Sequence, residues 1–371
     1  MLLRNKVAVM VLVFSCWLSA DRYEDNHEMF IKRSESKMRI AINGFGRIGR
    51  NFLRTICEDK QAQKKLDVAV INIGPADPHA VAHMFKYDTL LGAYKGNVSY
   101  ADGIFTVDDL KIKVIAQSDP SKLDWAADNI DWVVDATGRY TSAATAGVHN
   151  AAGAKYTLIT APCKGDIPTI VPGVNEDTVD LAKNRIFSLA SCTTNAVAPM
   201  LKVLHETFEI EQAFMTTVHA YTNSQVLIDV EAKDLRTSRA AALNIIRTET
   251  GASRAIELVL PMLQGRIQAT SLRVPVAKVS LIDLVIRTKK PLTVDAVNAA
   301  FDAAANGELK NIMFVSREQL VSSDFSGCPA SVIVDAPLTQ ADGYMCKTFG
   351  WYDNEWGYST RLKDFLLYVS K

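Results

Sequence analysis

One cysteine stands at the junction between an apolar run and a helical pattern, a place where a thiol can become reactive. Residues 186–190 predict a strand, and after Cys192 the apolar residues of 196–206 recur at helical spacing. Unpaired backbone N–H groups and the positive end of the helix dipole favour a thiolate, which is the nucleophilic form. Cys192 is therefore a candidate nucleophile, although an isolated free cysteine is more often a small buried apolar residue.

Two other residues could complete a catalytic group with this cysteine. His219 ends the alternating run 212–219, and Arg273 follows the apolar run 267–272. A neutral imidazole can accept a thiol proton, and an imidazolium can donate to a developing alkoxide. A guanidinium beside such a pair could bind a phosphate through two hydrogen bonds. Taken singly, each has a commoner structural role, so the hypothesis requires that the fold bring Cys192, His219 and Arg273 together.

A glycine-rich turn near the start of the chain predicts a dinucleotide site. Gly44-Phe-Gly-Arg-Ile-Gly49 lies between a β run at 39–43 and a helical pattern at 51–56, which is the context that a GxGxxG motif needs. Gly44 allows the tight turn, Gly46 lets a pyrophosphate approach the backbone, and Gly49 lets the helix pack on the strand. The phosphates would bind at the helix N-terminus.

The next strand, residues 66–71, ends without the acidic residue that usually binds the adenine ribose. Asn72 occupies that point and can hydrogen-bond a ribose without repelling a 2′-phosphate. Asp77 comes several residues later, beyond a Gly-Pro turn. The residues themselves therefore leave NAD and NADP both possible, and we slightly favour NAD.

The surrounding pattern predicts an α/β protein with two domains. Strands at 131–135 and 156–160 alternate with a helix at 143–152, which indicates a Rossmann-type parallel sheet with Thr137 and Thr160 at its ligand-binding edge. After Cys192, β runs at 212–219, 267–272, 279–287 and 330–335 indicate a second, α+β catalytic domain with a mixed, largely antiparallel sheet. Helices are expected at 251–263, 293–304 and 354–369.

Composition limits the classes of function. The 371 residues suffice for two domains, and 41 basic side chains balance 41 acidic ones, so no general attraction to nucleic acid or membrane is expected. The six cysteines are widely spaced and form no Cys/His cluster, so we expect no metal site and a reducing, cytoplasmic environment.

The N-terminal 37 residues need a separate interpretation. Residues 1–20 have a basic start, an apolar stretch and small residues at the end, as a secretory signal does, and 21–37 are polar. We favour an upstream extension, signal-like or mis-started, that the working protein does not carry; a true export signal is the alternative. The domains expected are then 38–190 for NAD(P) binding, 191–353 for catalysis, and a C-terminal helix at 354–371 that returns to the NAD(P)-binding domain.

Five separated motifs together resemble the glyceraldehyde-3-phosphate dehydrogenase family (phosphorylating, type I). They are Ile42-Asn-Gly-Phe-Gly-Arg-Ile-Gly-Arg50, Ser191-Cys-Thr-Thr-Asn195, His219-Ala-Tyr-Thr222, Leu272-Arg-Val-Pro275 and Trp351-Tyr-Asp-Asn-Glu-Trp-Gly-Tyr358, in matching order over about residues 38–371. The resemblance implies an NAD(P)-dependent oxidoreductase of glycolysis and glucose metabolism. It would oxidise D-glyceraldehyde 3-phosphate to 1,3-bisphosphoglycerate with inorganic phosphate. It also implies a homotetramer in which a loop at about 221–239 reaches toward a neighbour's cofactor.

The resemblance implies a role for each matching residue. Cys192 would form a thiohemiacetal and then a thioester, and His219 would take the hydroxyl proton. Substrate and attacking phosphate would be bound by Ser191, Thr193, Thr222, Thr250, Gly251 and Arg273. Together with the glycine turn, the cofactor-binding residues expected are Gly44, Phe45, Gly46, Arg47, Ile48, Gly49, Asn72, Thr137, Thr160, Asn354 and Tyr358.

Departures from the family pattern leave two alternatives. Ser224 replaces an acidic residue, and Thr237 stands where the family usually has a phosphate-binding arginine; losing that contact could weaken phosphate binding by about 1.5–3 kcal/mol. Arg236, Arg239 or Arg247 could compensate. A weak phosphate site would favour erythrose-4-phosphate dehydrogenase activity, in which water attacks the thioester. A non-catalytic, exported binding protein is the alternative of another class.

Overall fold

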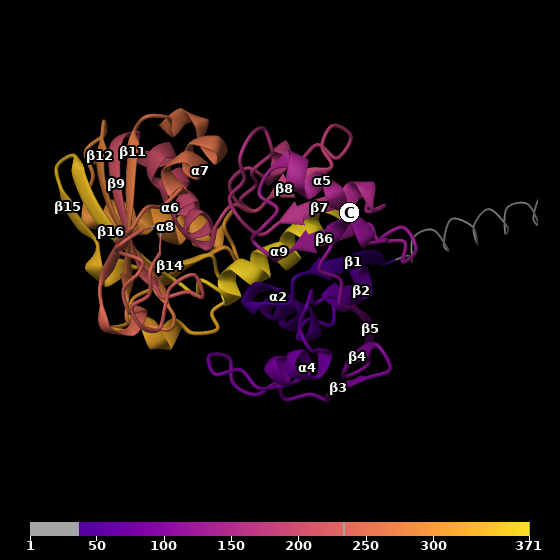
Figure 1. Cartoon of the computed structure of the whole chain (residues 1–371). Helices are drawn as coiled ribbons and strands as arrows, with labels where there is room; N and C mark the ends of the chain where they lie inside the picture. Colours follow the sequence, from indigo (N-terminus) through magenta and orange to yellow (C-terminus); the bar gives the residue numbers. More distant parts are fainter. Residues whose placement is uncertain (1–36, 233, 371) are drawn as a thin grey trace, which may run out of the picture. The chain divides into compact units, whose positions relative to one another are not determined.

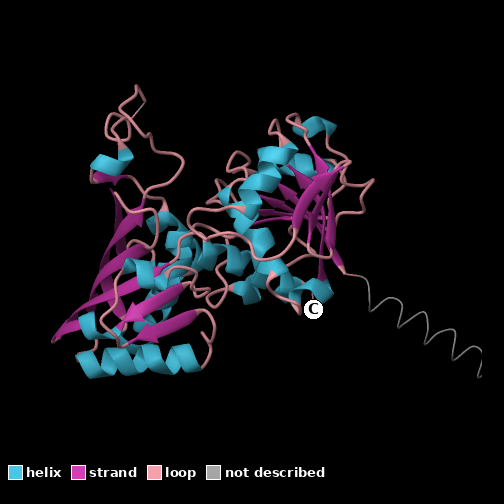
Figure 2. Ribbon diagram, turned by 90° about the horizontal axis from the view of Figure 1, so that it is seen from below, coloured by secondary structure: helices cyan, strands magenta, loops and turns pink. Residues whose placement is uncertain are grey.

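The computed structural model describes residues 37–232 and 234–370, and the segment from Arg39 onward forms one compact unit (Figure 1). The expectations for the N-terminal extension concern residues 1–37 and lie almost entirely outside the described residues. Two eight-stranded sheets make up the unit, and they are seen as separate groups of strands in Figure 2. The boundary expected between residues 190 and 191 falls between strand β8 (Ile186–Ser188) of the first sheet and helix α6 (Cys192–Phe208), which precedes the second sheet.

The first sheet has the strand order β3-β4-β5-β2-β1-β6-β7-β8. Its strands are β1 Met38–Asn43, β2 Leu66–Asn72, β3 Val98–Ala101, β4 Ile104–Val107, β5 Leu110–Ile115, β6 Trp132–Asp135, β7 Tyr156–Ile159 and β8 Ile186–Ser188. Pairing is parallel from β5 to β2 and from β1 through β8, whereas β3 and β4 add an antiparallel edge. All four residues of β6 are buried, as expected for a parallel strand that is covered on both faces.

Helices accompany this sheet as the alternating pattern predicted. They are α2 Arg47–Cys57, α3 Ala62–Lys65, α4 Pro78–Lys86 and α5 Ala143–Ala151, with short 3₁₀ turns η1 Pro120–Lys122 and η2 Glu176–Thr178. The C-terminal helix α9 Trp356–Val369 packs against α2, so the end of the chain returns to the first sheet (Figure 1). The edge strands β3–β5 and helix α4 were not expected from the sequence.

The second sheet has the order β10-β11-β9-β12-β16-β14-β13, with β15 paired to β16. Its strands are β9 Ile210–Ala220, β10 Ile246–Thr248, β11 Ile267–Val274, β12 Ser280–Thr288, β13 Met313–Ser316, β14 Val332–Asp335, β15 Gln340–Asp342 and β16 Met345–Tyr352. The pairs β11–β9 and β13–β14 are parallel and the others antiparallel. The expected mixed, largely antiparallel sheet is therefore confirmed.

Three helices cover one face of this sheet: α6 Cys192–Phe208, α7 Ala252–Val259 and α8 Val294–Asn306. Four 3₁₀ turns accompany them: η3 Ala241–Leu243, η4 Pro261–Leu263, η5 Ser322–Phe325 and η6 Ala336–Leu338. Their apolar residues form one cluster with the inward residues of β9, such as Ala213 and Met215. Phe214, between those two, has 63% of its surface exposed. Because side chains alternate across a strand, Phe214 points to the opposite face of the sheet, against which no helix of the described residues packs.

Arg47, at the start of α2, ties the glycine turn to the segment before α9. Its guanidinium contacts the carboxylates of Asp88 and Glu355, whose side chains are 4% and 13% exposed. Burial alone would lower the pKa of Arg47, but the two carboxylates raise it above its usual range. Arg47 therefore holds the turn and the segment containing Asn354 in a fixed relation.

Replacing Arg47 should destabilise the protein strongly because it leaves two buried carboxylates without their cation. For Arg47→Met we expect the free energy of unfolding to fall by about 3 kcal/mol in urea denaturation. The matched control is Arg317→Met, which breaks the exposed pair with Asp302 and should cost less than about 1 kcal/mol. Equal losses in the two variants would contradict a structural role for the Arg47 contacts.

Candidate active site

The turn before Cys192 is backbone-strained. Ala190 adopts φ +50°, in the left-handed region that non-glycine residues seldom occupy. Its carbonyl accepts a hydrogen bond from the Tyr358 hydroxyl (3.3 Å), and its N–H donates to Ser188 Oγ (3.0 Å). The strand, sharp turn and helix predicted from the sequence are confirmed, and the turn brings Cys192 to the first position of α6.

The start of α6 keeps donors free near the sulfur. Ser191 is the N-cap, and its hydroxyl accepts from the Thr194 N–H (3.1 Å). The N–H groups of Cys192 and Thr193 belong to the first turn, which has no intrahelical acceptor for them. They can therefore stabilise negative charge at this position.

The fold brings Cys192 and His219 into contact, with 3.5 Å between Sγ and Nε2. His219 lies near the end of β9, where the strand register places it opposite Arg273 of β11. Nδ1 of the ring lies 2.7 Å from the Ala220 carbonyl. His219 can act as a general base only in the tautomer that carries its proton on Nδ1 and leaves the Nε2 lone pair facing the thiol. Nδ1 lies between the Ala220 carbonyl, which can accept from that proton, and Arg273 Nη1, which can only donate.

His219 is held in its neutral form. Burial lowers its pKa to about 4, and the charge of Arg273 acts in the same direction. The Arg273 guanidinium donates to the Ala220 carbonyl (3.0 Å), and its Nη1 lies 2.5 Å from His219 Nδ1. At neutral pH the imidazole is therefore unprotonated and free to accept a proton.

The helix start alone does not hold Cys192 as a thiolate, which corrects the expectation drawn from sequence. Burial raises the pKa of the thiol; the charge of Arg273 and hydrogen bonds from Thr193 and the Cys192 N–H oppose this but do not overcome it. The proton therefore stays on the sulfur until a base accepts it. The only imidazole that the described residues place against the sulfur is that of His219.

A cavity of about 610 Å³ opens over this pair, and we call it the cysteine cavity. The predicted residues that line it are Arg47, Ile48, Thr160, Ser191, Cys192, Thr193, His219, Thr222, Thr250, Gly251, Arg273, Asn354 and Tyr358. All six residues expected to bind substrate and phosphate are among them. Because Arg47 is neutralised by two carboxylates, Arg273 is the cation in this lining that has no acidic partner among the described residues.

The arginines expected to compensate for Thr237 do not line the cysteine cavity. Arg239 instead pairs with Asp229, 2.6 Å away. Arg236 and Arg247 are exposed and lie outside the lining. Thr222, in contrast, reaches the cavity and hydrogen-bonds Ser224 (2.9 Å).

Two buried residues that sequence reasoning missed hold the site in place. The Tyr352 hydroxyl bridges Thr193 Oγ1 (2.9 Å) and Thr217 Oγ1 (2.7 Å), linking the start of α6 to β9. The Ser280 hydroxyl donates to Asn354 Oδ1 (3.1 Å), which turns the amide nitrogen of Asn354 outward as a donor. Tyr352 lies inside a quoted motif, whereas Ser280 carries no local sequence signal.

A second cavity, of about 390 Å³, lies beside the glycine turn, and we call it the adenosine cavity. Gly44 adopts φ +91°, and a Cβ there would meet Thr137 at 2.8 Å; a Cβ on Gly49 would meet the Gly44 carbonyl at 2.3 Å. Space is open at Gly46, where a Cβ would meet nothing within 4 Å. The three glycines thus take the roles predicted for them: a tight turn, an open approach and close helix packing.

The residues around the adenosine cavity fit a dinucleotide. The buried Nε of Arg50, which lines the cavity, has no hydrogen-bond partner, while its Nη1 donates to the Phe45 carbonyl (3.1 Å). An unpartnered guanidinium nitrogen at a helix N-terminus suits a phosphate. Of the predicted cofactor-binding residues, Gly44, Phe45, Gly46, Asn72 and Thr137 line this cavity.

Two of these side chains are already engaged within the protein. The Phe45 ring is buried and stacks on Phe85 at 6.1 Å. The Asn72 amide donates to Asn43 Oδ1 (2.8 Å) and the Gln117 carbonyl (3.0 Å), and its oxygen accepts from two backbone N–H groups. All its hydrogen-bonding positions are filled, so Asn72 shapes the cavity wall and leaves none free for a ribose hydroxyl.

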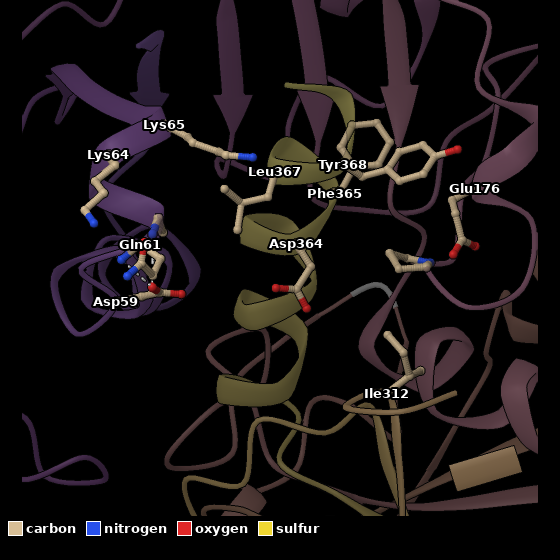
Figure 3. Close-up of a pocket in the computed structure, with 12 residues that line it drawn as sticks. Asp59, Gln61, Lys64, Lys65, Glu176, Ile312, Asp364, Phe365, Leu367 and Tyr368 are labelled. Atoms are coloured by element: carbon tan, nitrogen blue, oxygen red, sulfur yellow. Dashed lines mark hydrogen bonds between the residues drawn. The ribbon is translucent and has the colours of Figure 1, made fainter. Parts of the chain in front are cut away.

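A third cavity, of about 490 Å³, is lined by residues of α3 and α9 together with Glu176 and Ile312 (Figure 3). None of the residues predicted to bind or react lies in its wall. Across the described part of the chain, no set of three or more His, Cys, Asp or Glu side chains is arranged to hold a metal ion. No helix among the described residues has both the length and the apolar character needed to cross a bilayer.

Comparison with known proteins adds independent findings. Residues 38–143 match the family model described as "Glyceraldehyde 3-phosphate dehydrogenase, NAD binding domain", and residues 191–354 match that described as "Glyceraldehyde 3-phosphate dehydrogenase, C-terminal domain". The chain is 49% identical over 334 residues to glyceraldehyde-3-phosphate dehydrogenase of Streptomyces coelicolor, covering 90% of this chain and 98% of that protein.

Similar relatives include bacterial and chloroplast proteins. Identity is 46% over 335 residues with glyceraldehyde-3-phosphate dehydrogenase of Geobacillus stearothermophilus, covering 90% of this chain and 98% of that one. It is 48% over 333 residues with glyceraldehyde-3-phosphate dehydrogenase GAPB, chloroplastic, of Arabidopsis thaliana, covering 89% of this chain and 74% of that protein.

Proposed function

Because the chain belongs to the glyceraldehyde-3-phosphate dehydrogenase family, we propose that it oxidises D-glyceraldehyde 3-phosphate to 1,3-bisphosphoglycerate with NAD(P) and inorganic phosphate. One observation carries the proposal: the Cys192 sulfur lies 3.5 Å from a neutral imidazole, in a cavity whose unpaired cation is Arg273. A nucleophile, a base and an anion-binding group converge where a phosphorylated aldehyde could react.

The reaction begins with the sulfur of Cys192. The thiol proton passes to His219 Nε2 as the sulfur bonds to the aldehyde carbon. The imidazolium then gives the same proton to the former carbonyl oxygen, which becomes the hydroxyl of a thiohemiacetal and leaves His219 neutral again. The N–H of Cys192 at the start of α6 stabilises the oxyanion that develops on the way. Since burial keeps the proton on the sulfur, this transfer depends on contact with His219.

The same carbon is then oxidised, and phosphate afterwards releases it from the sulfur as an acyl phosphate. Bound NAD(P) supplies the hydride acceptor. As the carbon loses its hydride, His219 removes the hydroxyl proton, and the carbon becomes the carbonyl of a thioester. A phosphate oxygen then attacks that carbonyl, the acyl phosphate leaves, and the electron pair of the broken C–S bond returns to Cys192 as thiolate. The thioester conserves oxidation energy that a free acid would lose.

The chain's own side chains would orient the reactants. Asn354, with its amide oxygen fixed by Ser280, presents its nitrogen to the nicotinamide carboxamide, and the glycine turn with Arg50 receives the pyrophosphate. Thr222 and Arg273 bind the substrate's phosphate. Four further positions of the cysteine cavity form the pocket for the attacking phosphate: Ser191, Thr193, Thr250 and Gly251.

A steady-state assay tests this proposal against the sister activity. Purified protein should reduce NAD or NADP with glyceraldehyde 3-phosphate over many turnovers only when inorganic phosphate is present. Catalytic turnover without phosphate, and a free acid as product, would overturn it in favour of water attack on the thioester. Binding of substrate with no turnover under any condition would favour a non-catalytic protein.

Removing the Arg273 cation should weaken substrate binding and shift the pH profile of the activity. For Arg273→Gln we expect KM for glyceraldehyde 3-phosphate to rise by about 10- to 100-fold, because a charged hydrogen bond is lost. The pKa values of His219 and Cys192 should both rise, since a nearby positive charge lowers each of them. Activity should therefore fall at low pH and its optimum move to higher pH.

The control for Arg273 is Arg254→Gln, an exposed arginine on α7 outside the cysteine cavity. It should leave both KM and the pH profile unchanged. Non-phosphorylated glyceraldehyde should respond much less to Arg273→Gln than the phosphorylated substrate does. A uniform loss with both substrates would contradict a phosphate-binding role.

We further propose that the protein works as a cytoplasmic homotetramer. Apolar side chains of the loop region after β9 are exposed in the single chain, with Leu227, Leu235 and Leu243 at 79%, 81% and 83%. Exposed apolar groups of this kind mark interaction surfaces. The five cysteines that the structure describes are all free, which suits a reducing compartment. A monomer in sedimentation velocity at micromolar concentration would contradict the assembly.

A further inference from the structure

The adenosine cavity has an unbalanced charge. Two arginines, Arg50 and Arg139, belong to its lining, and no aspartate or glutamate of the described residues does. At the end of β2, where a carboxylate usually accepts from the ribose hydroxyls of NAD, the chain continues as Asn72, buried Ile73 and Gly74. The group that would hold a free 2′-hydroxyl and repel a 2′-phosphate is therefore missing from the wall.

The nearest acidic residues in sequence are engaged elsewhere. Asp77 caps α4 by accepting from the His79 N–H (3.0 Å), and Asp119 accepts from the Ser121 N–H (3.0 Å). Asp135 is fully buried and accepts from the Asn43 amide at 2.7 Å, from Thr137 and from His149. None of these three carboxylates lines the cavity.

Asn72 cannot take over the missing function, because its amide is saturated by contacts inside the protein. These contacts also fix the wall. The Asn72 oxygen accepts from the N–H groups of Gly74 and Gln117 at 3.2 and 3.0 Å, which holds the segments after β2 and β5 side by side. The cavity thus has a defined shape before any ligand enters it.

Arg139 is the free cation of this wall. The N–H of Arg139 donates to Thr137 Oγ1 (3.1 Å), which fixes the turn after β6. Its side chain is exposed, and within the described part of the chain its guanidinium makes no hydrogen bond or ion pair, although its charge acts on the neighbouring Tyr140 phenol. Arg50, in contrast, is tied to the Phe45 carbonyl at the pyrophosphate end.

We propose that the adenosine cavity binds an adenosine that carries a 2′-phosphate, with Arg139 supplying the positive charge, and that NADP is the cofactor this chain prefers. The inference rests on the proposed function for the rest of the cofactor's placement. A phosphate adds nearly two negative charges, and an arginine can bind it through two hydrogen bonds. With two arginines and no carboxylate in its lining, the wall attracts the group that distinguishes NADP from NAD.

Isothermal titration with two fragments tests the proposal without turnover. Adenosine 2′,5′-bisphosphate and adenosine 5′-monophosphate differ only in the 2′-phosphate. We expect the bisphosphate to bind about tenfold more tightly. Equal affinity, tighter binding of the monophosphate, or no binding of either nucleotide would overturn the proposal.

Substitutions in the cavity wall test whether its residues cause the difference in affinity between the two nucleotides. Arg139→Gln should abolish the advantage of the bisphosphate, and Ala76→Asp, which adds a carboxylate to the exposed rim, should reverse it. Lys310→Gln removes an exposed cation outside the cavity and should leave both affinities unchanged. An advantage that survives Arg139→Gln would show that the assignment is wrong.

The two proposals fail separately. The Cys192→Ser variant should keep the difference between the two fragments, because the sulfur does not line the adenosine cavity. A protein that prefers the bisphosphate but never oxidises the aldehyde would refute the proposed function alone. A protein that oxidises the aldehyde with NAD and binds the bisphosphate no better would refute the present inference alone.

Discussion

Cys192→Ser should lower kcat by at least about 10³-fold while leaving the fold unchanged. Serine is smaller than cysteine, and its hydroxyl is a far weaker nucleophile than a thiol paired with an imidazole. The hydrogen bonds that build the turn involve Ser191, Asn195 and the backbone of Ala190 rather than the sulfur. Stopped-flow and steady-state assays should therefore show loss of turnover with circular dichroism and urea midpoint unchanged.

The matched control is Cys163→Ser. Cys163 is also partly buried and lies outside the cysteine cavity, and its sulfur donates to the Ala161 carbonyl, a bond that a hydroxyl can replace. Its kcat should stay near the wild-type value. Wild-type activity in Cys192→Ser, or equal losses in the two variants, would contradict Cys192 as the nucleophile.

His219→Gln should lower kcat by about 10²- to 10⁴-fold, the usual contribution of a positioned acid–base group. The loss follows from the electrostatics of the thiol. Burial raises the pKa of Cys192, so without a base the reactive thiolate forms only as pH rises. The residual activity of the variant should therefore climb with pH, whereas the wild-type enzyme should depend on pH far less around neutrality, because His219 is neutral there.

His79→Gln serves as the control, since His79 is exposed on α4 and contacts only Tyr100 among the aromatic rings of the described residues. Its pH profile should match that of the wild type. If His219→Gln gives a flat residual profile, or retains full activity at neutral pH, the imidazole is not the base that takes the thiol proton.

Local sequence signals predicted the parts of the fold that carry chemistry. The glycine turn before α2 and the strand-to-helix junction at Cys192 could each be predicted from a few contiguous residues, because backbone φ and helix periodicity are local properties. Strand β9 was found by its alternation and gave His219. The edge strands β3–β5 were not predicted, because they are short and half exposed. The alternation of apolar and polar residues therefore extends over too few positions to indicate a strand.

Properties that depend on tertiary contacts could not be read from the sequence. Burial in the folded protein raises the pKa of Cys192 and outweighs the helix start that the sequence shows. Ser280 reaches Asn354 across 74 residues, and Tyr352 reaches Thr193 across 159. The saturation of Asn72 likewise depends on Asn43 at the end of β1 and on Gln117 in the segment after β5.

The central claim is that Cys192 carries the acyl group as a thioester that phosphate releases. The most direct measurement is mass spectrometry of the intact protein and its peptides after mixing with glyceraldehyde 3-phosphate and the oxidised cofactor without phosphate. We predict a 3-phosphoglyceroyl adduct on the peptide containing Cys192, which disappears when inorganic phosphate is added as 1,3-bisphosphoglycerate forms. Cofactor reduction without an adduct on Cys192, or an adduct that phosphate does not release, would contradict the account.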